Sequence, residues 1–253
     1  AYEEEGVRVF QTAGLKDDFG RALALNDLGK VVLAHGQLEE GRRCYEQSLQ
    51  IWRGINDRWG LPLTLSNLAA LDGLEGQYTK ARQAFLQALK IQDEEKDIWG
   101  VASSLRGLAD VAADQEQFDQ AAKYYYRSFK LHWELGRQRF ISECLEGLAT
   151  AAAGLSKPQW AAQLLGAAEK IRLTIGARMA DYEVVKHDRV VDATRETLGV
   201  EAFAAACVEG EQWLAGEGAM SEQVLQQVTA YAQELTANVP DQSDDFPLQN
   251  FTV

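Results

Sequence analysis

Apolar residues recur along most of the chain at spacings of three, four and seven, which is typical of amphipathic helices. The pattern itself repeats every forty residues. One leucine position recurs at Leu25, Leu65, Leu105 and Leu145, and a second at Leu28, Leu68, Leu108 and Leu148. Breaks such as the stretch 34–37 separate two apolar faces within each unit. Each unit is therefore predicted to be a helix, a tight turn and a second helix.

Residue size at two other positions predicts how the two helices of a unit pack. A small residue follows the second leucine, and a large residue recurs in the second helix. The small residues are Gly29, Ala69, Ala109 and Ala149, and the large ones are Tyr45, Phe85, Tyr125 and Leu165. We expect the small residues to let the partner helix approach closely, and the large side chains to fill the space that remains.

The stretch 17–20 reads Asp-Asp-Phe-Gly and contains the Asp-Phe-Gly triplet of protein kinases. Related stretches recur at Asp57 to Gly60 and at Asp97 to Gly100, one period and two periods later. A kinase uses its metal-binding Asp once, after a Gly-rich loop and a catalytic loop that this sequence does not show. We interpret the triplet as a boundary between repeats, where the Asp caps the next helix. Gly36 and Gly76 suit the sharp turn inside a unit.

These residues resemble the tetratricopeptide repeat family over roughly residues 20 to 176. The motif is Leu-x2-Leu-[Gly/Ala] in the first helix and [Ala/Gly]-x3-[Tyr/Phe]-x2-[Ala/Ser] in the second. The unit is forty residues rather than about thirty-four, so the helices or the loops must be longer. Glu116 and Ser156 also replace the turn glycine. HEAT repeats have the longer period but lack this small–aromatic–small spacing. The resemblance implies an all-α, right-handed solenoid of helix–turn–helix repeats.

The period predicts four parts of the chain. We expect residues 1–19 to be the second helix of a truncated repeat, 20–179 to be four repeats, 180–235 to be a degenerate repeat with a capping helix, and 236–253 to be a flexible tail. Apolar spacing predicts helices at 181–198, 201–214 and 221–235. The last is expected to be a cap, since a terminal repeat must present a polar outer face. Because residue 1 falls inside a repeat, we expect the chain to be a fragment of a longer protein.

Two later stretches, Trp160 to Ala177 and Thr197 to Leu214, resemble the carboxyl-terminal repeat region of large bacterial signal-transduction ATPases and transcription regulators. Those proteins often have a Pro after the Gly-Ala, where Arg178 and Met179 stand here. The resemblance implies a cytoplasmic regulatory or sensor arm whose partner is an upstream ATPase domain of the same protein. A stand-alone adaptor or scaffold built from the same repeats stays open as the alternative.

Composition argues against several other classes of function. The net charge is -13 and no cluster of Lys and Arg is present, which disfavours nucleic-acid binding. No apolar stretch approaches ~18 residues, so no membrane span is expected. Three cysteines, Cys44, Cys144 and Cys207, are expected to be small core residues. No histidine spacing suits a metal, and no phosphate-binding glycine loop occurs. We expect no enzyme activity, no cofactor and no metal.

The remaining hypothesis is recognition. The first helices of tetratricopeptide repeats line a concave surface, so the resemblance implies that their polar positions outside the packing set face a ligand. That ligand would be a protein, a peptide or a small polar effector. The alternative is that the same positions are simply solvated. The predicted ligand-binding residues are Asn26, Lys30, Ser66, Asn67, Ser103, Arg106 and Asp110.

Overall fold

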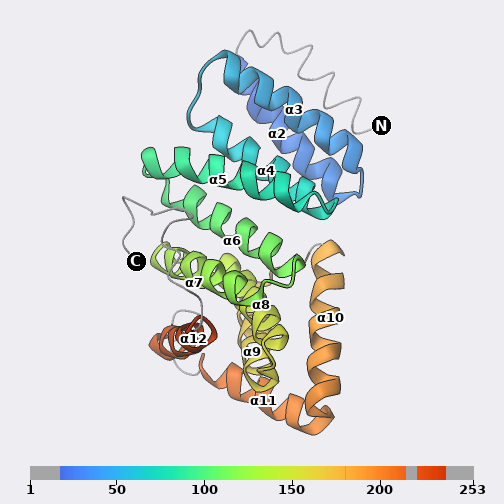
Figure 1. Ribbon diagram of the computed structural model, residues 1–253, viewed down its shortest axis with the longest axis vertical. Helices are drawn as coiled ribbons and strands as arrows, with labels where there is room; N and C mark the ends of the chain where they lie inside the picture. Colours follow the sequence, from blue (N-terminus) through green and yellow to red (C-terminus); the bar gives the residue numbers. More distant parts are fainter. Residues whose placement is uncertain (1–17, 180, 215–220, 238–253) are drawn as a thin grey trace. The chain divides into compact units, whose positions relative to one another are not determined.

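A computed structural model describes residues 18–179, 181–214 and 221–237 of the chain. These residues form eleven helices and no strand (Figure 1), so the predicted all-α fold class of helix–turn–helix repeats is confirmed. The helices are α2 (Asp18–Ala34), α3 (Leu38–Gly54), α4 (Gly60–Leu74), α5 (Tyr78–Glu94), α6 (Ile98–Asp114), α7 (Phe118–Glu134), α8 (Gln138–Gly154), α9 (Pro158–Ile175), α10 (Asp181–Leu198), α11 (Val200–Gln212) and α12 (Glu222–Leu235).

The chain divides into two compact units, Ala1–Gly100 and Val101–Val253. In the first unit, α2 packs against α3, α3 against α4, and α4 against α5. In the second unit, α8 packs against both α7 and α9, and α11 packs on α9. Within the repeats, helices therefore pack on their neighbours in sequence, as the period predicts. The right-handed twist of the solenoid stays a prediction.

The forty-residue period is explained by helix length. Helices α6 and α7 have 17 residues each, and turns of three residues follow them at 115–117 and 135–137. Two helices and two turns of these sizes account for the whole unit. The additional length relative to a thirty-four-residue repeat thus lies in the helices and not in long loops.

The turns within the pairs all require a left-handed backbone residue. Gly36 and Gly76 have φ of 76°, as their position in the sequence predicts. The amide of Gly36 donates to the carbonyl oxygen of Leu33 at 2.9 Å, which closes the end of α2. Glu116 and Ser156 occupy the same place in later repeats and keep φ near 60° and 58°. Since a Cβ disfavours this conformation, both residues carry local strain.

The capping role of the repeated Asp is confirmed where the structure describes it. The Asp57 carboxylate accepts hydrogen bonds from the amides of Trp59 at 3.0 Å and Gly60 at 2.6 Å. The Asp97 carboxylate accepts from the amide of Gly100 at 2.9 Å. All three bonds satisfy amides that have no partner inside the helix that follows. Asp17 lies outside the described residues.

The predicted packing of small against large residues is also present. Tyr45, Phe85 and Tyr125 are buried. A Cβ placed on Gly29 would lie 2.5 Å from the Tyr45 ring, which is closer than real contacts allow. The small residue is therefore required by the aromatic ring that faces it.

The three helices after the repeats form as predicted, with bounds that differ by one or two residues for α11 and α12. Ser221 caps α12 by accepting a hydrogen bond from the amide of Val224 at 3.4 Å. Val224, Val228 and Leu235 are buried as expected, and α12 packs against α7, α8 and α9. The division of the chain at residues 19, 179 and 235 stays a prediction. Residues 1–17 and 238–253, and with them most of the truncated helix and the tail, lie outside the described residues.

The described helices include none that is both long enough and apolar enough to cross a membrane. Cys44 and Cys144 are buried as predicted, while Cys207 is half-buried. Burial raises the pKa of the Cys144 thiol to about 12. This thiol is therefore a neutral core group at physiological pH.

Candidate functional site

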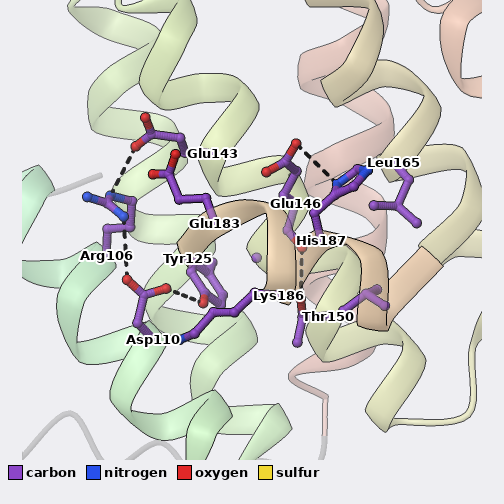
Figure 2. Close-up of a pocket in the computed structure, with 12 residues that line it drawn as sticks. Arg106, Asp110, Tyr125, Glu143, Glu146, Thr150, Leu165, Glu183, Lys186 and His187 are labelled. Carbon is purple, nitrogen blue, oxygen red and sulfur yellow. Dashed lines mark hydrogen bonds and ion pairs between the residues drawn. The ribbon is translucent and has the colours of Figure 1, made fainter. Parts of the chain in front are cut away.

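A pocket of about 110 Å³ lies in the second unit, where side chains of five helices, α6 to α10, meet (Figure 2). Six of its twelve lining residues are charged. Four carboxylates (Asp110, Glu143, Glu146 and Glu183) and two cations (Arg106 and Lys186) line it, together with His187. A pocket of this size holds a side-chain group or a small ion with its water, and it is smaller than most sites for whole metabolites.

One side of the pocket is a hydrogen-bonded network between α6, α7 and α8. The Arg106 guanidinium lies 3.4 Å from the Asp110 carboxylate and 3.5 Å from the Glu143 carboxylate. The Tyr125 hydroxyl donates to the other oxygen of Asp110 at 2.6 Å. Arg139 also holds Glu143, at 3.0 Å. The network orients Arg106 and Asp110 without withdrawing either from solvent completely.

The other side of the pocket joins α8 to α9 and α10. Glu146 on α8 is ion-paired with Arg172 on α9, and the Glu146 carboxylate lies 3.7 Å from Nδ1 of His187 on α10. Lys186, the neighbour of His187, donates to both carboxylate oxygens of Asp114 at 3.0 Å. Helix α10 therefore reaches α6 and α8 through charged and polar side chains.

Burial changes the protonation of the groups on this side. The pKa of Glu146 is raised to about 7: burial is the largest cause, Arg172 partly opposes the shift, and the charges of Glu183 and Glu143 add to it. Burial also lowers the pKa of His187, and the charge of Arg172 acts in the same direction. At neutral pH the Glu146 carboxyl is thus partly protonated, and His187 is neutral.

The chemistry of the pocket favours recognition over turnover. Carboxylates outnumber cations, so the pocket attracts a positively charged or hydrogen-bond-donating group. Across the described ranges, no group of three or more His, Cys, Asp or Glu side chains is arranged to hold a metal ion. The pocket can therefore pair with a charged side chain of a partner. That side chain would replace one member of an ion pair that is present now.

Two of the three predicted site residues in the second unit line the pocket. Arg106 and Asp110 do so from α6. Ser103 is half-buried one turn earlier, and its hydroxyl oxygen has no hydrogen-bond partner among the described residues. A ligand-binding role for these three residues stays a prediction.

In the first unit, two of the four predicted residues, Asn26 and Asn67, link one helix to another. Asn26 is completely buried, and its side-chain oxygen accepts from the Asn67 amide at 2.8 Å and from the Thr64 hydroxyl at 3.2 Å. The Ser66 hydroxyl donates to a carbonyl oxygen of its own helix at 3.0 Å. Lys30 is exposed and lies 3.4 Å from Asp27. The contacts of Asn26 join α2 to α4, whereas those of Ser66 and Lys30 stay within one helix. Binding of a ligand at these positions stays a prediction.

The predicted ligand-binding residues include none from α8, the first helix of the next repeat, which also lines the pocket. Glu143 and Glu146 stand forty residues after Ser103 and Arg106, and Thr150 stands forty after Asp110; all three line the pocket. Extending the same positions by one period would have found them. Glu183, Lys186 and His187 could not be found in this way, because α10 lies beyond the periodic part of the chain.

Comparison with known families agrees with this architecture. Residues 20–94 match the tetratricopeptide repeat family. The match covers α2 to α5 and supports a tetratricopeptide repeat domain in this part of the chain. No curated protein matches the chain. Arrays of these repeats present extended binding surfaces, so the family match indicates a protein-interaction module.

Proposed function

We propose that the chain is a non-catalytic recognition module that binds a charged segment of a protein at the pocket of its second unit. The observation that carries the proposal is the convergence of Arg106, Glu143 and Glu146 on one pocket. These residues come from the first helices of two successive repeats, α6 and α8. Repeat proteins present binding surfaces made of equivalent positions in successive repeats.

We further propose that the module is the regulatory arm of a larger bacterial signalling ATPase or transcription regulator, in the cytoplasm. The support is the resemblance of 160–177 and 197–214 to the terminal repeats of such proteins. In that setting the partner is an upstream domain of the same polypeptide. Binding would then shift the arm relative to the ATPase.

The gene tests the second part of this proposal directly. Its reading frame should encode a Gly-x4-Gly-Lys-[Ser/Thr] loop upstream of Ala1, because a nucleotide-binding domain needs that loop to hold phosphates. A complete reading frame without the loop would overturn the ATPase assignment.

Binding is tested with overlapping peptides that cover the rest of the natural protein. We expect at least one charged peptide to bind the purified chain, and Arg106→Ala or Glu143→Gln to weaken that binding about tenfold or more. Arg58→Ala is the matched control, since Arg58 makes comparable ion pairs with Glu94 and Glu95 in the first unit. Equal binding by all four proteins would place recognition elsewhere.

A further inference from the structure

Helix α10 is held less firmly than the repeat helices beside it. Helix α8 buries nine residues, whereas within residues 183–198 of α10 only Thr194 is buried. Val184 and Val185 are 38% and 62% exposed. Since apolar burial is the main force that anchors a helix, α10 is anchored less firmly than α8, although it packs against α9, α11 and α8.

The contacts that α10 makes across the pocket are polar and accessible to water. The Lys186 and Asp114 side chains are 47% and 30% exposed, and ion pairs of this kind contribute little stability. His187 faces Glu146 at 3.7 Å without a close hydrogen bond. Such contacts set where α10 lies but do not prevent it from leaving.

A glycine with a left-handed backbone ends the helix before α10, and a second one follows α10 directly. Gly176 follows α9 with φ of 64°, and Gly199 separates α10 from α11 with φ of 82°. Glycine accepts backbone angles that other residues avoid, so a few torsions at these points can reorient the helix between them. Rotation about Gly199 can move α10 relative to α11, which is packed on α9.

We propose that α10 is an exchangeable occupant of the α6–α8 face, and that the partner of this face is a helical protein segment with the same chemistry. Such a segment would place a lysine on Asp114 and a polar side chain opposite Glu146. This inference rests on the proposed function, because it concerns the same pocket. It adds the class of partner, a helical segment, and it says that this segment must displace α10.

The competition follows from charge. When α10 leaves, Asp114 loses the cation that neutralises it, and an incoming lysine restores the pair. A partner helix therefore gains the contacts that α10 gives up, in the way that amphipathic helices enter grooves. Its apparent affinity is reduced by the fraction of molecules in which α10 still covers the face. Weakening α10 should thus strengthen binding in trans.

A labelled synthetic peptide of residues 181–198 serves as the probe, with binding to the full chain followed by fluorescence anisotropy up to millimolar protein. The Lys186→Glu chain should bind this peptide about fivefold or more tightly than the unaltered chain, because its own α10 is repelled by Asp114. The Asp114→Lys chain should instead prefer a peptide that carries Lys186→Glu. Both substituted side chains are partly exposed, so the variants are expected to fold.

Two further chains complete the test. The double variant Asp114→Lys with Lys186→Glu restores the pair with opposite polarity and should bind the natural peptide no better than the unaltered chain. Lys90→Glu, an exposed charge reversal in the first unit, should change nothing. The proposal is overturned if no chain binds either peptide, or if binding ignores the charge at position 114. The peptide survey of the proposed function does not depend on α10, so the two can fail separately.

Discussion

The hydroxyl of Ser128 on α7 donates a 2.8 Å hydrogen bond to the carbonyl oxygen of Ala102 on α6. Eighty residues earlier, Ser48 on α3 donates in the same way to Ala22 on α2, at 2.7 Å. Both hydroxyls are buried. The bond therefore ties the second helix of a repeat to the first, in addition to the apolar packing between them.

Ser128→Ala should lower the free energy of unfolding by about 0.5–1.5 kcal/mol, because a buried hydrogen bond is lost while the carbonyl keeps its helical partner. Urea unfolding followed by circular dichroism measures the change. Thr79→Ala, at an exposed position on α5, is the control and should have little effect. An unchanged midpoint for Ser128→Ala would show that the bond adds nothing to packing.

The aromatic residues should be far more sensitive. Replacing Tyr45, Phe85 or Tyr125 by Ala is expected to cost about 3–5 kcal/mol, since each removes a buried ring and leaves a cavity. Tyr125→Phe should cost only about 1 kcal/mol, because it removes the bond to Asp110 and keeps the ring. Trp59→Ala, at a side chain that is 54% exposed, provides the comparison. Equal losses at Trp59 and Tyr45 would contradict the assigned packing.

Asn26→Ala should destabilise the chain by about 1–3 kcal/mol, because Thr64 and Asn67 lose their shared acceptor in a buried setting. Lys30→Ala, one turn away but exposed, should cost less than about 0.5 kcal/mol. Thermal unfolding of both variants separates a structural role from a solvated one. If Asn26→Ala unfolds like the unaltered chain, the polar network between α2 and α4 does not stabilise this unit.

Relief of turn strain should stabilise the protein. Glu116→Gly and Ser156→Gly are each expected to raise the free energy of unfolding by about 1 kcal/mol, since glycine accepts a positive φ without a Cβ clash. Glu116→Ala keeps the Cβ and should give no gain. A decrease in stability with both glycines would show that the turns tolerate a side chain without strain.

Stability should also depend on the protonation of Glu146. Its pKa is raised from 4.5 to about 7, chiefly by burial, so its neutral form suits the folded state better. The stabilising contribution is complete below about pH 4.5 and is lost as pH rises through 7. Glu146→Gln should therefore raise the free energy of unfolding by roughly 1–3 kcal/mol at pH 8, whereas the two proteins should be equally stable near pH 4.

The same titration has two checks. Glu134→Gln, at an exposed position of α7, should leave the curve unchanged. His187 has a lowered pKa and so opposes folding when it is protonated at lower pH. Because it lies 3.7 Å from Glu146, the same comparison is repeated with His187→Ala in both proteins, where the pH dependence should persist. A constant difference between pH 4 and pH 8 would mean that Glu146 titrates normally.

Much of the fold could be predicted because forty-residue spacing constrains many positions at once. Gly29 and Tyr45, for example, stand at positions that are small and large, respectively, in every later repeat. Their packing against each other could therefore be predicted. The role of Asn26 could not be predicted in this way. A polar residue on a first helix reads as surface unless its partners are known, and Thr64 and Asn67 become its partners only when α2 and α4 pack together.

The pocket shows the same limit. Arg106, Asp110 and Glu146 line the pocket from repeat positions, which the period makes visible in the sequence. Helix α10 was predicted to form, but its place over α6 and α8 depends on pairs such as Lys186 with Asp114, which are 72 residues apart and have no counterpart elsewhere in the sequence. Single long-range ion pairs leave no periodic trace.

The length of the helices sets the breadth of the surface that a partner meets. At 1.5 Å per residue, a helix of 17 residues is roughly 25 Å long. A helical partner aligned with α6 and α8 can therefore make contact over four to five turns, whereas an extended peptide spanning the same breadth would need only about eight residues. Longer repeats give this protein a wider platform without adding a single loop.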